Sequence, residues 1–336
     1  MKVLFIGGTG EISEAVSRLA VKKGIDLYLF NRGNNKEFMP QGAKLIEGDI
    51  YQEDKAADIL ADYSFDVVVD WIAFGPENIK RDIRLFRDKT EQYIFISSAS
   101  VYQKPPTDYL ITESTPLHNP YLEYARNKIA CERVLREEYR QTGFPMTIVR
   151  PSHTYGRSSI PAAINSFSDP WSLVERMRRG KKVVVHGDGT SLWTITHNTD
   201  FARAFIGLLG NQKAVGHAFH ITAEKPLNWN QITETVGKAA GVEPEIAHLS
   251  SDLISEFMPN KRGSLLGDKA WSLVFDNSKI KRFVPEYEIK VPFMQGMNEA
   301  IKWFEAHPKK CSVDQEWNQK MDQLVTMYEN LLNKKD

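Results

Sequence analysis

The chain has 336 residues with 43 lysine plus arginine and 43 aspartate plus glutamate side chains, so it lacks the basic field of a nucleic-acid-binding protein. Its length suits a large nucleotide-binding domain, a smaller second domain and a well-buried core. Two cysteines indicate no disulfide framework and no metal cluster, so we expect no bound metal. The sequence shows no secretory leader and no run of about 18 apolar residues, from which we expect a cytoplasmic protein without a membrane partner.

The chain opens with an apolar strand that runs into a glycine turn. Val3–Ile6 is an uninterrupted apolar run, as expected of a strand buried on both faces of a parallel sheet. Gly7 and Gly10 then allow a tight turn and a close approach of the backbone to a pyrophosphate at the N-terminus of the next helix, expected over 14–23. The pattern favours a dinucleotide site, with a turn that binds no ligand as the alternative.

The second predicted strand, at 26–30, ends at Asn31 and Arg32. Enzymes that prefer NAD usually place an acidic residue here to hold the ribose 2′-hydroxyl. A carboxylate would repel a 2′-phosphate, whereas a guanidinium pairs with it. The pair therefore favours NADP(H), with NAD(H) possible if Arg32 lies over the adenine or in water.

Strands and helices continue to alternate through the first half of the chain. Further strands are expected at 44–49, 65–70, 92–96 and 144–151. Helices are expected at 53–62, 79–89 and 124–140. This alternation predicts an α/β fold with a doubly wound parallel sheet of Rossmann type. Ligands of such sheets bind outside the carboxyl ends of the strands, where Asp49, 71–74 and 97–100 fall.

The second half of the chain is predicted to form a smaller α+β substrate lobe. The Rossmann domain is expected over 1–155, with segments near 197–220 returning to it, and the lobe over 156–336. Residues 156–170 are expected to form a long loop over the site, since long loops in compact enzymes are often lids. Other expected elements are helices at 171–179, 199–209 and 228–240, a strand at 181–185 and an amphipathic tail at 312–336.

Five motifs in this order resemble the extended short-chain dehydrogenase/reductase superfamily, in particular its NAD-dependent epimerase/dehydratase family. They are Gly-Gly-Thr-Gly at 7–10, Gly-Asp at 48–49, Ser-Ser-Ala-Ser-Val-Tyr at 97–102, Tyr-x-x-x-Lys at 124–128 and Arg-Pro-Ser-His-Thr-Tyr-Gly at 150–156. The resemblance covers about the first 305 residues. It implies hydride transfer at an alcohol or ketone carbon of a sugar or nucleotide-sugar.

The resemblance assigns catalysis to Ser98, Tyr124 and Lys128. Helical spacing places Tyr124 and Lys128 on one face, one turn apart. A free tyrosine ionises near pH 10, but a neighbouring ammonium and an oxidised nicotinamide favour the phenolate, so we expect a lowered pKa for Tyr124. By analogy Tyr124 is the general acid/base, Lys128 also binds the nicotinamide ribose, and Ser98 hydrogen-bonds the substrate oxygen.

The resemblance also implies binding residues along the carboxyl edge of the sheet. The predicted cofactor-binding residues are Gly7, Thr9, Gly10, Glu11, Ile12, Asn31, Arg32, Asp49, Ile50, Ile72, Ala73, Ser97, Tyr124, Lys128, Pro151 and His153. The predicted substrate-binding residues are Phe74, Ser100, His153 and Trp193.

Three departures from the family pattern bear on the substrate. His153 stands where many relatives carry asparagine, and it either contacts nicotinamide or substrate or is a satisfied loop histidine. The segment 190–193 lacks the arginine that many nucleotide-sugar enzymes place near the nucleotide phosphates. Asp70 and Trp71 replace a more usual histidine–apolar pair, and Asp70 is interpreted as a buried hydrogen-bonding acid rather than a catalyst.

Three functions remain open from the sequence. The first is a sugar or nucleotide-sugar epimerase or dehydratase, and the second is an NADP(H)-dependent carbonyl reductase of a non-nucleotide small molecule. The third is a non-catalytic nucleotide- or RNA-binding protein, because chloroplast stem-loop-binding proteins resemble this superfamily. The neutral charge and the intact Ser98, Tyr124 and Lys128 argue against the third. Family practice also predicts a homodimer through the helices at 79–89 and 124–140.

Overall fold

A seven-stranded parallel sheet is the centre of the computed structural model, which describes residues 1–333. The strand order is β12-β7-β5-β4-β1-β2-β3, so the direction of the chain across the sheet reverses beside β1. In chain order the strands are β1 (Lys2–Ile6), β2 (Asp26–Asn31), β3 (Lys44–Glu47), β4 (Phe65–Asp70), β5 (Thr90–Ile96), β7 (Met146–Pro151) and β12 (Ala218–Ile221). This is the predicted doubly wound fold, with the switch point at the glycine turn.

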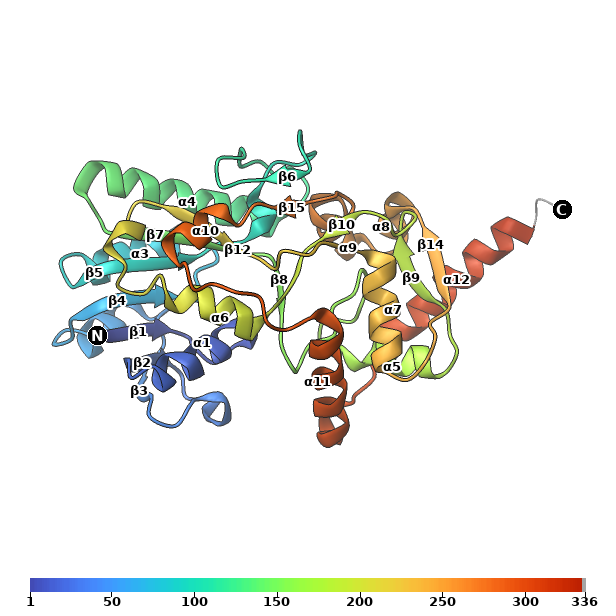
Figure 1. Cartoon of the computed structure of the whole chain (residues 1–336), viewed down its shortest axis with the longest axis horizontal. Coiled ribbons are helices and arrows are strands. Elements are labelled where there is room, and N and C mark those ends of the chain that lie inside the picture. Colours follow the sequence, from blue (N-terminus) through green and yellow to red (C-terminus); the bar gives the residue numbers. More distant parts are fainter. Residues whose placement is uncertain (334–336) are drawn as a thin grey trace.

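Helices cover both faces of the sheet (Figure 1). They are α1 (Glu11–Lys22), α2 (Glu53–Ile59), α3 (Pro76–Phe86), α4 (Glu123–Thr142), α6 (Asn198–Ile206) and α10 (Ser278–Phe283). Along β1, Val3 and Phe5 pack in the core beneath α1 and α6, whereas Leu4 and Ile6 pack in the core beneath α3 and α4. Alternate side chains of a strand point to opposite faces, which is why the predicted apolar run fills two cores.

The first helix begins earlier than the sequence indicated. Its N-cap is Gly10 and its first residue is Glu11, whereas the prediction began at residue 14. The Ser13 side chain accepts a hydrogen bond from the Gly10 amide at 2.9 Å, which closes the turn directly onto the helix. Gly24 follows the helix with φ +76°, a left-handed conformation that favours glycine. The start of α1 therefore lies immediately at the glycine turn.

The second lobe is a smaller α+β unit at the carboxyl edge of the sheet (Figure 1). Its helices are α5 (Trp171–Arg178), α7 (Trp229–Ala239), α8 (Ser251–Phe257), α9 (Pro259–Ser264), α11 (Phe293–Ala306) and α12 (Gln315–Asn333). Its paired strands are β9 (Val183–His186) with β14 (Ile246–Leu249), and β10 (Leu192–Trp193) with β13 (Leu227–Asn228). Asn228 caps α7, since its side chain accepts from the Gln231 amide at 2.8 Å.

Short elements join the two parts of the molecule. The paired strands are β8 (His153–Tyr155) with β11 (Ile195–His197), and β6 (Leu110–Ile111) with β15 (Val274–Phe275). Single turns are η1 (Lys36–Phe38), η2 (Ala99–Val101), η3 (Gln212–Ala214), the π-helical η4 (Leu265–Lys269) and η5 (Pro308–Lys310). Residues 156–170 contain no helix or strand, in agreement with the predicted loop.

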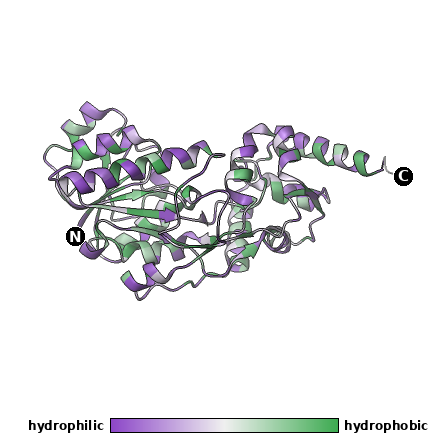
Figure 2. Ribbon diagram, turned by 90° about the horizontal axis from the view of Figure 1, so that it is seen from above, coloured by the Kyte–Doolittle hydropathy of each residue, from purple (hydrophilic) through white to green (hydrophobic). Residues whose placement is uncertain are grey.

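Hydrophobic residues concentrate in the sheet and on the inner faces of its helices (Figure 2). In the tail, Trp317, Met321 and Leu324 of α12 are buried against the second lobe, whereas Leu331 is exposed. The last three residues of the predicted tail, 334–336, lie outside the described residues. No helix within 1–333 is long and apolar enough to cross a bilayer.

Candidate active site

A cavity of about 620 Å³ opens at the carboxyl edge of the sheet, beside the switch point. It is lined by Gly7, Gly8, Thr9, Gly10, Glu11, Ile12, Ser13, Phe30, Asn31, Arg32, Asn34, Asn35, Gly48, Asp49, Ile50, Tyr51, Trp71, Ile72, Phe74, Ile96, Ser97, Tyr124, Lys128 and Pro151. The glycine turn and the Tyr-x-x-x-Lys helix, 114 or more residues apart in the chain, therefore line one cavity. We call it the cofactor pocket below.

The glycine turn forms a cradle that larger residues would fill. Gly7 and Gly8 have φ +96° and +92°, which side-chain-bearing residues rarely adopt. A Cβ on Gly8 would lie 2.6 Å from Leu29 Cδ2. The amides that open α1 have no acceptor within the helix and lie at its positive end. An open backbone cradle at a helix N-terminus fits the pyrophosphate of a dinucleotide.

Asn31 has a structural task that the sequence did not reveal. Its side-chain Nδ2 donates to the Gly7 carbonyl oxygen at 3.1 Å, and its Oδ1 accepts from the Gly33 amide at 2.9 Å. Asn31 thus braces the glycine turn from the neighbouring strand. Arg32 beside it is exposed and lines the pocket, and within residues 1–333 it forms no ion pair or side-chain hydrogen bond. Its guanidinium is available to an anionic group.

Lys128 lies at the opposite end of the pocket from Arg32. Its side chain is 1% exposed, and its Nζ donates to the carbonyl oxygens of Ala73 at 2.7 Å and Ile96 at 2.8 Å. The ammonium also lies 5.5 Å from the centre of the Tyr124 ring. Burial lowers the pKa of Lys128 to about 8. The two carbonyls hold the ammonium at the pocket wall and leave one N–H for a further acceptor.

The groups of the chain around Tyr124 raise its pKa, and the expected lowering, which also depends on an oxidised nicotinamide, stays a prediction. Burial of its hydroxyl group raises the pKa of Tyr124 to about 12, and Ser98 acts in the opposite direction. The charge of Asp268 adds to the rise. Tyr124 is therefore a neutral phenol at pH 7, able to donate a proton, although the residue is 40% exposed.

The serines of the 97–102 motif divide their tasks. The Ser97 hydroxyl donates to Glu132 Oε1 at 2.7 Å, so its side chain belongs to the buried Glu132–Arg150 ion pair. Ser98 is half-buried, and its hydroxyl lies 2.9 Å from the Ser100 hydroxyl. A hydrogen bond from Ser98 lowers the pKa of Tyr124. The role of Ser98 toward the substrate oxygen stays a prediction, and neither Ser98 nor Ser100 lines the cofactor pocket.

Two further predicted binding residues, His153 and Trp193, do not line the cofactor pocket. His153 belongs to β8, and burial, with a smaller effect of Lys269, lowers its pKa to about 3, so its imidazole is neutral at pH 7. Trp193 is 2% exposed in the core of the second lobe, with its ring 6.2 Å from that of Phe275. The prediction that Trp193 binds substrate gains no support from its position, because apolar packing encloses its ring.

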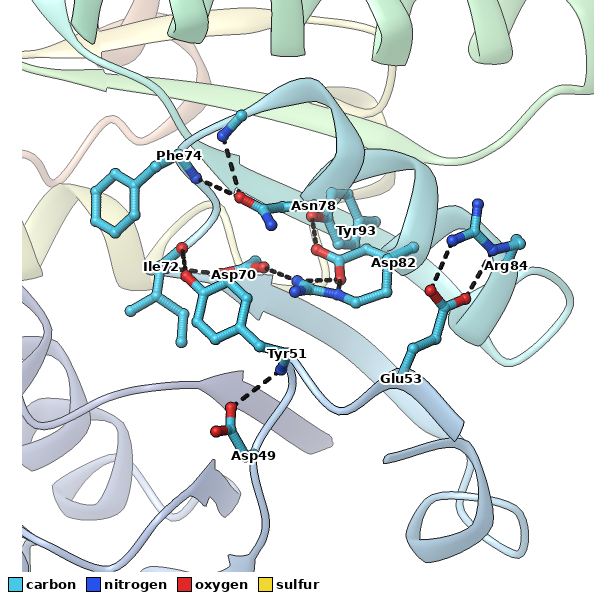
Figure 3. Close-up of polar contacts among 12 residues, drawn as sticks. Asp49, Tyr51, Glu53, Asp70, Ile72, Phe74, Asn78, Asp82, Arg84 and Tyr93 are labelled. Carbon is cyan, nitrogen blue, oxygen red and sulfur yellow. Dashed lines mark hydrogen bonds and ion pairs between the residues drawn. The ribbon is translucent and has the colours of Figure 1, made fainter. Parts of the chain in front are cut away.

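Asp70 belongs to a buried polar network beneath the pocket (Figure 3). Its carboxylate accepts from the Ile72 amide at 2.6 Å and from Arg81 Nη2 at 3.1 Å. Arg81 also binds Asp82 at 2.6 Å, and burial with the neighbouring Asp70 raises the pKa of Asp82 well above its usual range. Asp70 is therefore a buried hydrogen-bonding acid, as the sequence indicated, while its partners on α3 were missed.

The same network fixes the pocket wall. The Tyr51 hydroxyl donates to the Ile72 carbonyl oxygen at 2.7 Å, opposite the Asp70 contact to the Ile72 amide (Figure 3). The next carbonyl, that of Ala73, holds Lys128. The predicted cofactor residues Ile72 and Ala73 are thus held in place from both sides. A polar pair at 81–82 inside the apolar spacing of α3 was the sequence signal for this network.

Residues 156–158 lie against the start of α1. The Ser158 hydroxyl donates to Glu11 Oε2, and Arg157 Nη2 donates to Glu14 at 2.8 Å. Asn198 Nδ2 donates to the Glu11 carbonyl oxygen at 2.8 Å. These contacts attach the first residues of the predicted lid to the rim of the cofactor pocket.

Comparison with known proteins places this pocket in context. Residues 3–222 match the model of the NAD dependent epimerase/dehydratase family. The chain is 30% identical over 261 residues to chloroplast stem-loop binding protein of 41 kDa b from Arabidopsis thaliana, over 74% of this chain and 65% of that protein. The match therefore spans slightly less than two thirds of that relative.

Two more similarities cover most of the chain. It is 23% identical to 2′-dehydrokanamycin reductase from Streptomyces kanamyceticus, over 86% of this chain and 80% of the reductase. The structure of UDP-glucuronic acid 4-epimerase from Bacillus cereus, in complex with UDP-glucuronic acid and NAD, aligns with a TM-score of 0.72 and 18% identity. That alignment covers 91% of this chain and 99% of the epimerase, and it shows a shared fold.

Proposed function

Because the chain belongs to the NAD-dependent epimerase/dehydratase family, we propose that it transfers hydride at an alcohol or ketone carbon of a sugar or nucleotide-sugar. One observation carries this proposal. The cofactor pocket contains the glycine cradle after β1, Arg32 after β2 on one side of it and Lys128 with Tyr124 on the other side, along the carboxyl edge of the sheet.

The residues of the pocket fit a nicotinamide dinucleotide. The turn at 7–10 and the first amides of α1 would receive the pyrophosphate, and Arg32 would accept a 2′-phosphate. Lys128 would bind the ribose hydroxyls next to the nicotinamide, which supplies the hydride acceptor or donor when bound. Asn31, Asp70 and Tyr51 hold the cradle and the wall at Ile72 in place.

Tyr124 would move the proton that accompanies the hydride. Its neutral phenol can donate a hydrogen bond and then a proton to a carbonyl oxygen that becomes an alkoxide. In the reverse direction it must ionise, and the positive charges of Lys128 and of an oxidised nicotinamide would offset the burial that raises its pKa. Ser98, next to the phenol, would hydrogen-bond the same substrate oxygen.

The test is hydride transfer with a matched pair of tyrosine variants. Tyr124→Phe removes the transferable proton and keeps the ring, so turnover should fall. Tyr121→Phe is the control, because Tyr121 precedes the helix and does not line the pocket. Equal turnover by Tyr124→Phe and the unmodified protein would refute the role of Tyr124.

A net NADP(H)-dependent carbonyl reductase is the second candidate. The exposed Arg32 favours it, since NADP(H) usually exchanges at each turnover, and one relative is named as the reductase of 2′-dehydrokanamycin. Mass spectrometry of the purified protein distinguishes the two. Retained NAD with a nucleoside diphosphate supports an epimerase, whereas exchangeable NADPH and no retained cofactor support a reductase.

RNA binding is the third candidate, because one relative is named a stem-loop binding protein. The equal numbers of acidic and basic side chains weigh against it. A gel-shift titration with a stem-loop RNA at physiological salt tests it. Binding at submicromolar protein that Arg32→Ala or the dinucleotide abolishes would place RNA in the same pocket.

A further inference from the structure

Glu11 places an acidic side chain beside a cradle suited to a diphosphate. It is the first residue of α1 and lines the cofactor pocket. The amides and the dipole at the start of a helix favour one anion there. A bound dinucleotide would bring its two phosphate charges to the same place. Ionised Glu11 and the dinucleotide would therefore repel each other.

The Glu11 side chain is held against the chain that follows β8. The Ser158 hydroxyl donates to its Oε2. A Cβ on Gly156 would lie 2.5 Å from Glu11 Oε1, so the carboxyl group rests directly on the Gly156 backbone. Asn198 fixes the Glu11 backbone through its carbonyl oxygen. The carboxyl group is thus turned toward 156–158 and away from the centre of the turn.

The surrounding charges leave Glu11 without a cation of its own. Glu14, one turn along α1, is bound by Arg18 and Arg157, each at 2.8 Å, whereas Glu11 has no ion pair within residues 1–333. Asn198 at the start of α6 contacts the Glu11 backbone, whereas His197 lines a second cavity with Glu14, which Glu11 does not line. The charged residues elsewhere in the pocket are Arg32, Asp49 and Lys128. Burial, with a contribution from Glu14, raises the pKa of Glu11, while the Ser158 hydroxyl and the backbone amides of Gly156 and Ser158 oppose the rise.

We propose that Glu11 takes up one proton when a dinucleotide binds, and that Ser158 is a positioning residue that keeps its carboxyl group out of the phosphate cradle. The inference rests on the proposed function, since it requires the diphosphate at the glycine turn. The proton comes from solvent and removes the repulsion between the carboxylate and the phosphates. The Ser158 hydroxyl donates to the ionised carboxylate and accepts from the protonated acid, so the contact is kept in both states.

The sign of the pH dependence follows from linkage. The dinucleotide raises the pKa of Glu11 further, so between the free and the bound pKa values the complex holds one more proton than the free protein. Affinity then falls as pH rises through that window, by up to about tenfold per pH unit. The window begins above the ordinary glutamate range, because the pKa of the free protein is already raised.

Isothermal titration with NAD⁺ between pH 5.5 and 8.5 tests the proposal, and repeating it in two buffers of different ionisation enthalpy counts the protons taken up. NAD⁺ is used because it lacks the 2′-phosphate, whose own ionisation would add protons. The Glu11→Gln variant should bind NAD⁺ without taking up that proton. Its NAD⁺ affinity should no longer fall as the pH rises through the window. Glu37→Gln is the control, because Glu37 is exposed and does not line the pocket, and it should keep the unmodified pH dependence.

The role of Ser158 is tested by rescue. Ser158→Ala frees the carboxylate to reach the amides of the turn, so NAD⁺ affinity at pH 8 should fall at least about threefold. Adding Glu11→Gln to this variant should restore it. Thermal melting monitors the fold of each variant.

The outcomes distinguish a failure of the proposed function from a failure of the roles given to Glu11 and Ser158. If the unmodified protein binds neither NAD⁺ nor NADP⁺ at any pH, the proposed function is wrong. If it binds NAD⁺ with the same proton uptake as Glu11→Gln, the function stands and the role of Glu11 is wrong. If Ser158→Ala binds as the unmodified protein does, or if Glu11→Gln fails to rescue it, Ser158 is not a positioning residue.

Discussion

Arg32→Ala should convert a preference for NADPH into equal binding of NADPH and NADH. Arg32 is exposed at the pocket rim and lacks a partner within residues 1–333, so no intramolecular contact is lost when it is truncated. A hydrogen bond between charged groups contributes about 1.5–3 kcal/mol. Solvent screens an exposed pair, so we expect the lower end, about tenfold in NADPH affinity, with NADH affinity unchanged.

The neighbouring residue provides a contrasting variant. Asn31→Asp would lose the donor to the Gly7 carbonyl and set a carboxylate against that oxygen, so the glycine turn would loosen. It should weaken NADPH and NADH alike, although an acidic residue at this position favours NAD in other enzymes. Lys36→Ala is the charge-matched control, because Lys36 is exposed on the same loop, pairs with Glu47 at 3.4 Å and does not line the pocket.

The assay is isothermal titration of both cofactors against the four proteins at two salt concentrations. The NADPH preference of the unmodified protein should shrink at high salt, and that of Arg32→Ala should be absent throughout. Equal affinity of the unmodified protein for NADH and NADPH would refute the role of Arg32. A loss of both cofactors in Arg32→Ala would show that Arg32 contacts a part common to both.

Three other predictions follow from the same geometry. Lys128→Met should weaken binding of both cofactors and also lower turnover, measured by titration and steady-state kinetics, because it removes a ribose donor; unchanged affinity would contradict that role. Asp70→Ala should lower the free energy of unfolding in urea by about 3–5 kcal/mol, because it leaves the buried Arg81 with one carboxylate fewer (Figure 3). As the control, Glu53→Gln at the exposed Arg84 pair should lower it by less than about 1 kcal/mol. Light scattering at micromolar concentration should show a dimer, as expected if α3 and α4 pair with the same helices of a second chain, and a monomer would exclude that state.

The fold followed from local patterns, because each central strand is an apolar run that ends at a turn. Val3–Ile6 and Phe65–Asp70 needed no long-range information to be recognised as buried strands. The start of α1 was placed three residues late, since Gly10 reads as part of a turn while Ser13 closes the helix onto it.

The roles of polar residues were harder to predict because their partners are distant in the chain. Asn31 was interpreted through its place next to Arg32, but its amide binds Gly7, 24 residues away. The contact between Ser158 and Glu11 joins residues 147 positions apart. Trp193 was assigned to the substrate from its place in a motif, and only the packing of the second lobe shows that its ring is enclosed. Such partners depend on tertiary contacts that a single sequence does not display.

The central claim is that Tyr124 moves a proton during hydride transfer in the cofactor pocket. The most direct measurement mixes the protein with oxidised cofactor and a panel of sugars and nucleotide-sugars, following nicotinamide reduction by absorbance and products by mass spectrometry. We predict turnover of at least one substrate that falls at least about 100-fold in Tyr124→Phe, with cofactor affinity nearly unchanged, and that persists in Tyr121→Phe. Turnover that survives in Tyr124→Phe would contradict the claim.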